Sequence, residues 1–438
     1  MVNRQIVTFI LMVLCVALTL SSAQAKNLYS YVVVGPDKTQ IIRVIVDDNH
    51  CPTLYSADKA YNMTLRVASD ANHDNPSYFP VAVCELVKPI NITELTLDNQ
   101  PLPLLPAHIN KIAVIGDTGC RIKAPFSYQG CNDPQAWPLQ TVARSIASEK
   151  PDVLIHVGDY LYRESRCITQ GCQGSVHGYG WESWQEDVFK PMREMMLTTP
   201  MVFVRGNHES CHRAGQGWFR FLDPYPYNPQ HACVKPNAVD MDQPYSIIVN
   251  PSLQWIVFDS AEIQELHPTA HFEDFVHSMN RVGELLQPQY HHWLLLHHPS
   301  LGYAYSHILG WNGGTTEIYN ALLQAKPKLM DQFDLFIQGH IHTFAISNYR
   351  ESGLPLNIVS GMGGTSLEDR FPAKNLTGYA VQNTAHISKE VNDQHFGFLV
   401  YSEVSGQSML NVKDTEGHNR MTCQIHISTR DFTCQPHD

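Results

Sequence analysis

The sequence predicts a layered α/β fold that follows a small N-terminal all-β domain. Two observations support this fold class. Beyond residue 107, short apolar runs typical of buried strands end in polar motifs, and segments with helical spacing lie between them. Before that point, β-rich runs are separated by Gly, Pro, Asn and Asp. We therefore expect a signal peptide at 1–25, a β-sandwich-like accessory domain at 26–106 and a catalytic domain at 107–438.

The first 25 residues have the features of a secretory signal peptide. Arg4 gives a positive start, residues 6–20 form an apolar run, and small residues lie at Ala23 and Ala25. A membrane anchor is the alternative, but this run is shorter than the roughly 20 residues that a spanning helix needs. We expect cleavage near Ala25, no membrane span in the rest of the chain, and a secreted or periplasmic protein.

Composition narrows the possible partners. The 438 residues carry a formal net charge of -12, which argues against binding nucleic acid by bulk attraction. A small phosphate ester remains a possible partner because a local metal charge can outweigh a distant surface field. The sequence gives no indication of the oligomeric state.

Ten cysteines follow the signal peptide, and an even count in an exported chain suggests disulfides. A thiolate metal site is the alternative, but no paired C-x-x-C spacing supports it. The expected pairs join neighbouring cysteines: Cys51–Cys84, Cys120–Cys131, Cys167–Cys172, Cys211–Cys233 and Cys423–Cys434.

The N-terminal domain is expected to contain strands at 29–34, 40–46 and 78–83. Three prolines near residues 101–106 form a stiff linker after these strands. We find no set of catalytic residue types in this region, so an accessory role is the simplest interpretation.

In the catalytic domain, each predicted strand ends in a polar motif, and residues 138–150 have helical spacing. Ligands of layered α/β proteins gather beyond the carboxyl ends of the strands, so these motifs are expected to meet. The strands and motifs are 111–115 before Gly116-Asp117, 153–157 before Gly158-Asp159, 201–204 before Arg205-Gly206-Asn207-His208, 293–296 before His297-His298-Pro299, and 335–338 before Gly339-His340-Ile341-His342.

The residue types in these motifs point to a two-metal site. Carboxylate, imidazole and amide groups suit a pair of hard or borderline cations, and one carboxylate can bridge two ions. His340 and His342 lie two residues apart, so they share a face of an extended chain. Glycines precede Asp117, Asp159, Asn207 and His340, and we expect them to allow tight turns that present the next side chain.

The order GD, GD, GNH, H and GHxH resembles the calcineurin-like metallophosphoesterase superfamily over roughly residues 110–345, with the glycine-rich 360–365 after it. This resemblance implies a four-layer α/β/β/α sandwich. Many members carry a histidine two residues after the first aspartate, where this chain has Gly119. Tyr162, three residues after Asp159, is instead similar to purple acid phosphatases, in which this tyrosine ligates a ferric ion.

Carried over by position, the resemblance implies two metal ions with separate ligand sets. The first, expected to be Fe(III), would take Asp117, Asp159, Tyr162 and His342. The second, a divalent Zn, Mn or Fe ion, would take Asp159, Asn207, His297 and His340. A tyrosine that only packs in the core is the alternative for Tyr162. The family pattern selects His297 over His298, because the ligand lies two residues before Pro299.

The implied reaction is hydrolysis of a phosphate monoester by hydroxide made available on the metals. His208 is expected to stabilise the transition state or protonate the leaving oxygen, and Glu209 either orients His208 or belongs to a surface turn. His298 and His307 are further candidates for contact with phosphate, with packing and solvation as their alternatives. Phosphodiester hydrolysis on nucleotides or lipid headgroups is the main competing function. A non-catalytic secreted metal-binding or interaction protein is the other.

Overall fold

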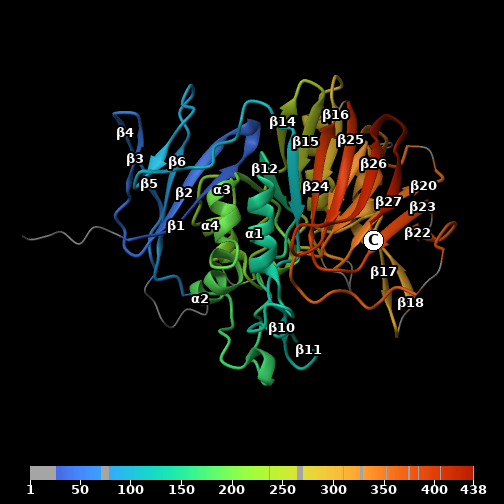
Figure 1. The fold of residues 1–438 in the computed structure, drawn as a ribbon, viewed down its shortest axis with the longest axis horizontal. Coiled ribbons are helices and arrows are strands. Elements are labelled where there is room, and N and C mark those ends of the chain that lie inside the picture. The colour runs from blue at the N-terminus through green and yellow to red at the C-terminus, as the bar shows by residue number, and fades with distance from the viewer. Residues whose placement is uncertain are drawn as a thin grey trace, which may run out of the picture.

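The computed structural model describes residues 26–70, 78–235, 237–263, 270–308, 310–325, 329–351, 353–372, 375–382, 384–404 and 406–437, so the expected signal peptide lies outside the described residues. Two large β-sheets dominate the described chain (Figure 1). In order of neighbours, the first sheet contains β27 (Asp431–Pro436), β26 (Asn419–His426), β25 (Gln407–Lys413), β24 (Phe398–Val404), β9 (Lys111–Ile115), β12 (Val153–His156), β13 (Met201–Phe203), β1 (Asn27–Val34), β2 (Gln40–Val46), β6 (Ala82–Val87) and β5 (Thr64–Val67).

The second sheet and three smaller ones complete the strands of the described residues. The second sheet contains β14 (Tyr245–Asn250), β15 (Leu253–Val257), β16 (His291–Leu295), β19 (Leu335–Gln338), β21 (Leu356–Ser360), β20 (Phe344–Tyr349), β23 (Ala385–Asp393) and β22 (Ala380–Gln382). The smaller sheets are β10 (Ile122–Lys123) with β11 (Ser127–Tyr128), β17 (Tyr303–Ser306) with β18 (Gly310–Gly313), and β4 (Lys59–Asn62), β3 (Thr53–Ser56), β7 (Thr96–Leu97) and β8 (Gln100–Pro101).

Helices cover the outer faces of both large sheets. The α-helices are α1 (Leu139–Glu149), α2 (Trp181–Trp184), α3 (Arg193–Thr198), α4 (Gly215–Phe221), α5 (Phe272–Leu285) and α6 (Thr316–Ala325). In α1 the apolar residues Leu139, Val142 and Ile146 recur at helical spacing and pack against the first sheet, as the sequence predicts. Helices α5 and α6 share a core with β15, β16 and β19 of the second sheet.

A third apolar cluster fills the space between the two sheets. Val114, Ile155 and Val202 of the first sheet belong to the same buried cluster as Trp255 and Trp293 of the second. The order of layers is therefore helices, sheet, sheet and helices, and the predicted four-layer sandwich is confirmed.

The parallel register of the strands brings the polar motifs of each sheet to the same edge. Strands β9, β12 and β13 are parallel, and their ends Ile115, His156 and Phe203 lie side by side. In the second sheet β16 and β19 are also parallel, with Leu295 opposite Ile337. Because parallel strands bring their carboxyl ends to the same edge, the loops that follow converge.

The N-terminal strands extend the first sheet. Val33 of β1 pairs in parallel with Met201 of β13, so β1, β2, β6 and β5 continue the sheet that contains β9 and β12. The small sheet of β4, β3, β7 and β8 adds Leu54 and Leu97 to a separate apolar cluster on these strands. The proposed division of the chain at residue 106 stays a prediction.

One N-terminal strand lies later than expected. The run at 78–83 is observed as β6 at Ala82–Val87, and Phe79 forms only an isolated bridge with Asp70. Pro80 lacks an N–H to donate to a neighbouring strand, which explains the later start.

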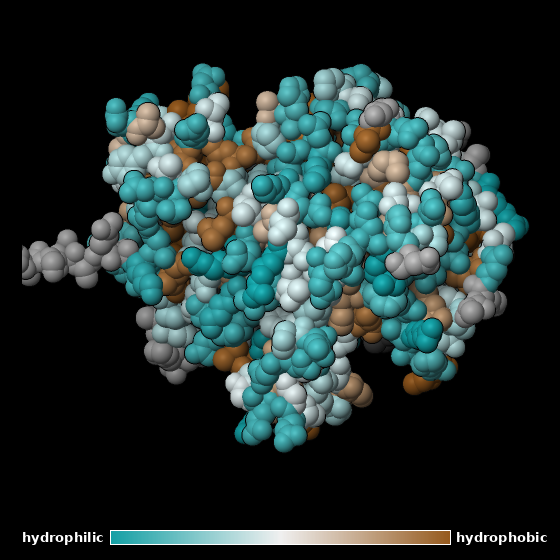
Figure 2. All heavy atoms as spheres, viewed as in Figure 1, coloured by the Kyte–Doolittle hydropathy of each residue, from teal (hydrophilic) through white to brown (hydrophobic). Residues whose placement is uncertain are grey.

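The ten cysteines of the described chain form five disulfides. All five predicted pairings are confirmed: Cys51–Cys84, Cys120–Cys131, Cys167–Cys172, Cys211–Cys233 and Cys423–Cys434. This content is typical of chains that fold in an oxidising compartment outside the cytosol. Among the described residues, no helix has the length and apolar character needed to cross a membrane. Hydrophilic side chains cover most of the face in Figure 2, with apolar ones scattered between them.

Candidate metal centre

Three of the predicted ligands have a left-handed backbone. The φ angles of Asp117, Asp159 and His340 are 56°, 58° and 70°. Non-glycine residues rarely adopt this conformation, and it is concentrated at functional sites. Here it turns each side chain away from its strand direction and toward a common centre between the two sheets.

Tyr162 lies at the centre of the first predicted ligand set. Its phenolic oxygen is 3.0 Å from Oδ1 of Asp117, 2.7 Å from Oδ2 of Asp159 and 3.1 Å from Nε2 of His342. All four side chains are buried. The residues that the resemblance assigned to one ion are thus brought together.

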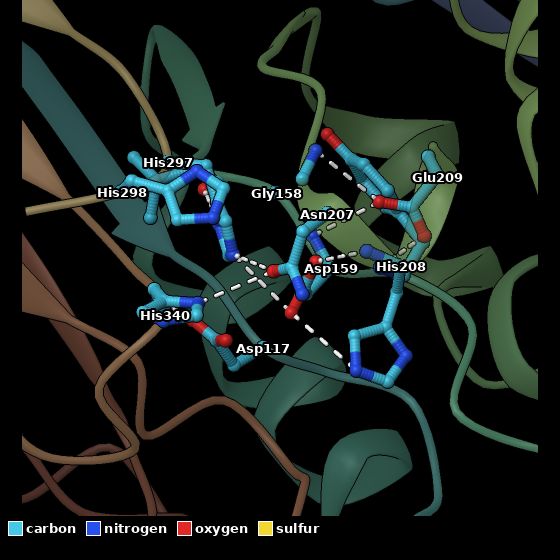
Figure 3. Close-up of polar contacts among 12 residues, drawn as sticks. Asp117, Gly158, Asp159, Asn207, His208, Glu209, His297, His298 and His340 are labelled. Atoms are coloured by element: carbon cyan, nitrogen blue, oxygen red, sulfur yellow. Dashed lines mark hydrogen bonds and ion pairs between the residues drawn. The ribbon is translucent and has the colours of Figure 1, made fainter. Parts of the chain in front are cut away.

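The second predicted set meets on the other side of Asp159. Oδ2 of Asp159 is 3.2 Å from Nε2 of His297, and the side-chain amide of Asn207 is 3.0 Å from that nitrogen. The same amide is 3.2 Å from Nδ1 of His340. One ligand atom each of Asp159, His297 and His340 lie within 4.8 Å of one another. Figure 3 shows His297 and His340 on one side of Asp159 and Asn207, with His208 on the other.

Backbone carbonyls fix the orientation of two of these imidazoles. Nδ1 of His297 lies 2.8 Å from the carbonyl of Val157, and Nδ1 of His342 lies 2.8 Å from the carbonyl of Ser366. In each ring, the hydrogen bond of one nitrogen leaves the other nitrogen directed at the cluster. Metal-ligating histidines commonly have this arrangement.

The electrostatics of the cluster favour bound cations. Burial and the charge of Asp159 raise the pKa of Asp117 well above its ordinary value. Burial would also raise the pKa of Asp159, but electrostatic interactions with His297 and His208 hold it well below its ordinary value. Burial and both carboxylates raise the pKa of Tyr162. A phenolate beside two buried carboxylates is costly without a cation between them, so this donor set fits a pair of metal ions.

Close contacts leave no room for a side chain at the motif glycines Gly116, Gly158, Gly206 and Gly339. A Cβ on Gly206 would lie 2.2 Å from Oδ1 of Asp159, and one on Gly158 would lie 2.5 Å from Nδ1 of His297. Gly158 also has a φ of 101°. These glycines therefore let the loops approach one another closely.

Asp187 holds Tyr162 in place, a role that the sequence analysis missed. It lies in a π-helical turn at Gln185–Phe189, and its Oδ2 accepts a hydrogen bond of 3.0 Å from the backbone N–H of Tyr162. Its Oδ1 accepts another from the N–H of Cys120. No local motif surrounds Asp187, so only the fold reveals its position beside the cluster.

One sequence interpretation expected Glu209 to orient His208, but among the described residues no hydrogen bond joins the Glu209 carboxylate to the His208 ring. Its carboxylate accepts hydrogen bonds of 3.1, 2.9 and 3.1 Å from the backbone N–H groups of Asp159, Tyr160 and Leu161. It is completely buried, which excludes the alternative of a surface turn. Glu209 thus fixes the loop that presents Asp159 and Tyr162.

His208 faces the cluster from the side of the cavity. Its ring lies 3.7 Å from that of Tyr162, and its Nε2 is 3.9 Å from Oδ2 of Asp159. Nδ1 contacts the carbonyl of Leu161 at 3.0 Å and the Glu164 carboxylate at 3.1 Å. Burial lowers the pKa of His208 well below its ordinary value, against the opposing charge of Asp159.

The other two candidate histidines, His298 and His307, are not among the described residues that line the cavity. His298 is completely buried, contacts Ser260 Oγ at 2.9 Å through Nδ1, and lies 4.6 Å from the His340 ring. Those contacts favour packing beside the ligands over contact with phosphate. His307 is exposed next to β17, and its backbone N–H donates to Asp369.

A cavity of about 720 Å³ opens onto the cluster. Asp159, Tyr162, Asn207, His340 and His342 form part of its wall, and His208 lines it as well. This volume lies within the range of small-molecule sites. Arg121, Lys123 and Arg213 also line the cavity, although no sequence motif drew attention to them.

Known proteins share this architecture. The chain resembles the structure of purple acid phosphatase PPD1 from yellow lupin (Lupinus luteus) seeds, with a TM-score of 0.55, 13% identity, and coverage of 90% of this chain and 73% of the lupin one. It also resembles the structure of PhoD, with a TM-score of 0.59, 9% identity, and coverage of 93% and 91%. At these identities the likeness concerns the fold alone. No curated protein sequence matches the chain.

The sequence profile of the calcineurin-like phosphoesterases matches residues 110–344, which is more than half of the 438 residues. The matched region begins just before β9 and ends just after His342, so it contains all the strand-end motifs that meet at the cluster. The family uses a dinuclear metal centre, and the donor set between the two sheets fits one. The chain therefore belongs to the calcineurin-like phosphoesterase family and is a metal-dependent phosphoester hydrolase.

Proposed function

We propose that the protein is an exported phosphomonoesterase of the purple acid phosphatase type. The observation that carries this proposal is the position of Tyr162, whose phenolic oxygen lies within 3.1 Å of Asp117, Asp159 and His342. A phenolate suits a hard trivalent ion, which supports Fe(III) in this half of the centre. The half formed by Asp159, Asn207, His297 and His340 would hold a divalent Zn, Mn or Fe ion.

Metal ions bound by these residues would supply charge neutralisation at the phosphoryl oxygens and an activated water. The chain contributes the rest of the chemistry. His208 lies on the cavity side of Asp159 and Tyr162, so its Nε2 is available to the transferring phosphoryl group or the leaving oxygen. Glu209 and Asp187 hold the loop of Asp159 and Tyr162 by backbone hydrogen bonds, which fixes the geometry before substrate arrives.

Export is part of the proposal. The expected signal peptide at 1–25 lies outside the described residues, while five disulfides support folding in an oxidising compartment. N-terminal sequencing of the protein recovered from the periplasm or medium should begin at Lys26. A chain that retains Met1 would contradict cleavage near Ala25.

Phosphodiester hydrolysis is the second candidate, because a cavity of about 720 Å³ has room for a substituent on each side of a phosphate. The deciding experiment compares matched aryl phosphate mono- and diesters from acid to neutral pH. Preference for the monoester, lost in Asn207→Ala and kept in the exposed control Asn110→Ala, supports the proposal. Preference for the diester assigns the same centre to a phosphodiesterase. Protein that holds two metals and hydrolyses neither ester would support a binding role.

A further inference from the structure

The cavity carries positive charge beyond the metal centre. Arg121 lies in the loop after β9, Lys123 lies in β10, and Arg213 follows the turn that presents Asn207 and His208. All three cationic side chains line the cavity. Their positive charges contrast with the formal net charge of -12 of the whole chain.

The two arginines lie beside different halves of the cluster. The guanidinium of Arg121 is 6.0 Å from the Tyr162 ring centroid, and its Nη1 is 3.5 Å from Nδ1 of His342. Nη1 of Arg213 lies 3.1 Å from the side-chain amide of Asn207. The arginines therefore reach the rim of both predicted metal sites.

The carboxylates near this rim do not offset its positive charge fully. Glu164 is shared between Lys123 at 4.0 Å and Arg213 at 3.7 Å. Glu262 lines the cavity but pairs with Arg205 at 3.0 Å. Glu368 also lines the cavity and interacts electrostatically with Arg121, although among the described residues no carboxylate lies within salt-bridge distance of the Arg121 guanidinium.

Two metal ions held by the cluster would neutralise the oxygens of the phosphoryl group that is transferred. The three cations are thus in excess of what a simple monoester needs. Arginine presents a planar set of donors that matches phosphate or carboxylate oxygens, and it holds this geometry with little loss of side-chain entropy.

We infer that the preferred substrate is a phosphate monoester with a second anionic group, phosphate or carboxylate, on its leaving part, and that Arg121 and Arg213 are the residues that select it. This inference rests on the proposed monoesterase function. Lys123 adds charge to the same rim, and Glu164 positions both Lys123 and Arg213.

Three matched esters test the inference on the metal-loaded full chain: propyl phosphate, 3-(phosphonooxy)propanoate and propane-1,3-diol bisphosphate. Wild type should have the highest kcat/KM for the esters with a second anion. Arg121→Gln and Arg213→Gln should each reduce this preference by about tenfold or more through KM, because a charge-assisted hydrogen bond is lost. The preference of Arg121→Lys should lie between those of wild type and Arg121→Gln. The exposed control Arg144→Gln in α1 should show the same preference as wild type.

A higher kcat/KM for the bisphosphate alone, relative to propyl phosphate, identifies phosphate as the second group. A higher kcat/KM for both charged esters shows that the site accepts either phosphate or carboxylate. Equal kcat/KM for all three esters in wild type overturns the inference and leaves the monoesterase function intact. Equal losses on all three esters in both arginine variants overturn it as well. If wild type hydrolyses none of them, the proposed function fails. Calorimetric binding of the bisphosphate against propyl phosphate, in wild type and both variants, then decides the inference by itself.

Discussion

The phenolic oxygen of Tyr162 lies 2.7 Å from Oδ2 of Asp159, the carboxylate that both predicted metal sites share. Burial and the two neighbouring aspartates oppose ionisation of this phenol, so a cation must stabilise the phenolate. The tyrosine thus reports directly on the ion beside it.

Tyr162→Phe should remove the visible absorption of the iron-loaded protein. A phenyl ring fills the same space but has no oxygen to donate charge to a ferric ion. Iron content and the absorption spectrum are measured together, with Tyr160→Phe as control, because Tyr160 Oη contacts the Val204 carbonyl away from the ligands. A colourless wild type loaded with iron, or a coloured Tyr162→Phe, would contradict the tyrosinate assignment.

Gly119→Ala should displace Tyr162 and weaken the same absorption. Its Cβ would lie 2.6 Å from the Tyr160 carbonyl and 2.8 Å from the Tyr162 nitrogen, so the loop must shift. The control is the exposed Asn110→Ala, which lies away from the cluster. An unchanged spectrum and kcat in Gly119→Ala would show that the loop tolerates the side chain.

His208→Gln should lower kcat for phosphate esters by roughly 100- to 10,000-fold, the usual contribution of a positioned acid or transition-state donor. Metal content should remain that of wild type, because His208 is outside both predicted ligand sets. Steady-state kinetics with metal analysis distinguish these effects, and the exposed His177→Gln is the control. Loss of one metal ion in His208→Gln would make this residue a ligand.

Metal removal should lower the melting temperature. Ions that bind only the folded chain stabilise it by about 2.7 kcal/mol at a concentration of 100 Kd. Chelation also leaves the buried carboxylates of Asp117 and Asp159 without the charge of the metal ions. Differential scanning fluorimetry should show a fall on chelation and recovery when metal is returned. The double variant Asp117→Asn, Asp159→Asn should not respond to metal, and a response equal to that of wild type would place the ions elsewhere.

Acid should destabilise the fold through His156. Burial and the nearby His297 charge lower the pKa of His156 to about 3. Below its ordinary pKa the unfolded chain takes up a proton that the folded chain refuses. The stabilisation is therefore complete above about pH 6.5 and lost as pH falls toward 3, by roughly 1.4 kcal/mol per pH unit.

His156→Gln removes this one contribution. Urea unfolding at pH 7 and pH 5 should show a smaller loss of stability on acidification in the variant than in wild type. The same change in both proteins would mean that His156 is protonated in the folded state. The exposed His177→Gln again serves as control, because its pH dependence should equal that of wild type.

Much of the centre could be predicted because its chemistry is local in sequence. Each motif directly follows a buried strand, and parallel register alone brings Asp117, Asp159 and Asn207 to one edge. The disulfides were predictable for a similar reason, since each joins cysteines that are neighbours among the ten. The four-layer order came from the family resemblance.

Residues that act from other parts of the fold could not be predicted in this way. Asp187 reaches Tyr162 from a helical turn, and Arg121 is an ordinary loop arginine until the cavity is seen. The role of the glycines was also only partly predicted. Gly206 is required by its contact with Asp159, while Asp117 and Asp159 adopt the left-handed backbone themselves.

The parallel pairing of Val33 with Met201 has a consequence for synthesis of the chain. β1 leaves the ribosome long before β13, so one edge of the N-terminal strands has no partner while the following segment is still being made. Exposed strand edges are templates for pairing with other chains. A chaperone that covers this edge until β13 arrives would therefore raise the yield of native protein, and a shortened chain that ends before β13 would aggregate.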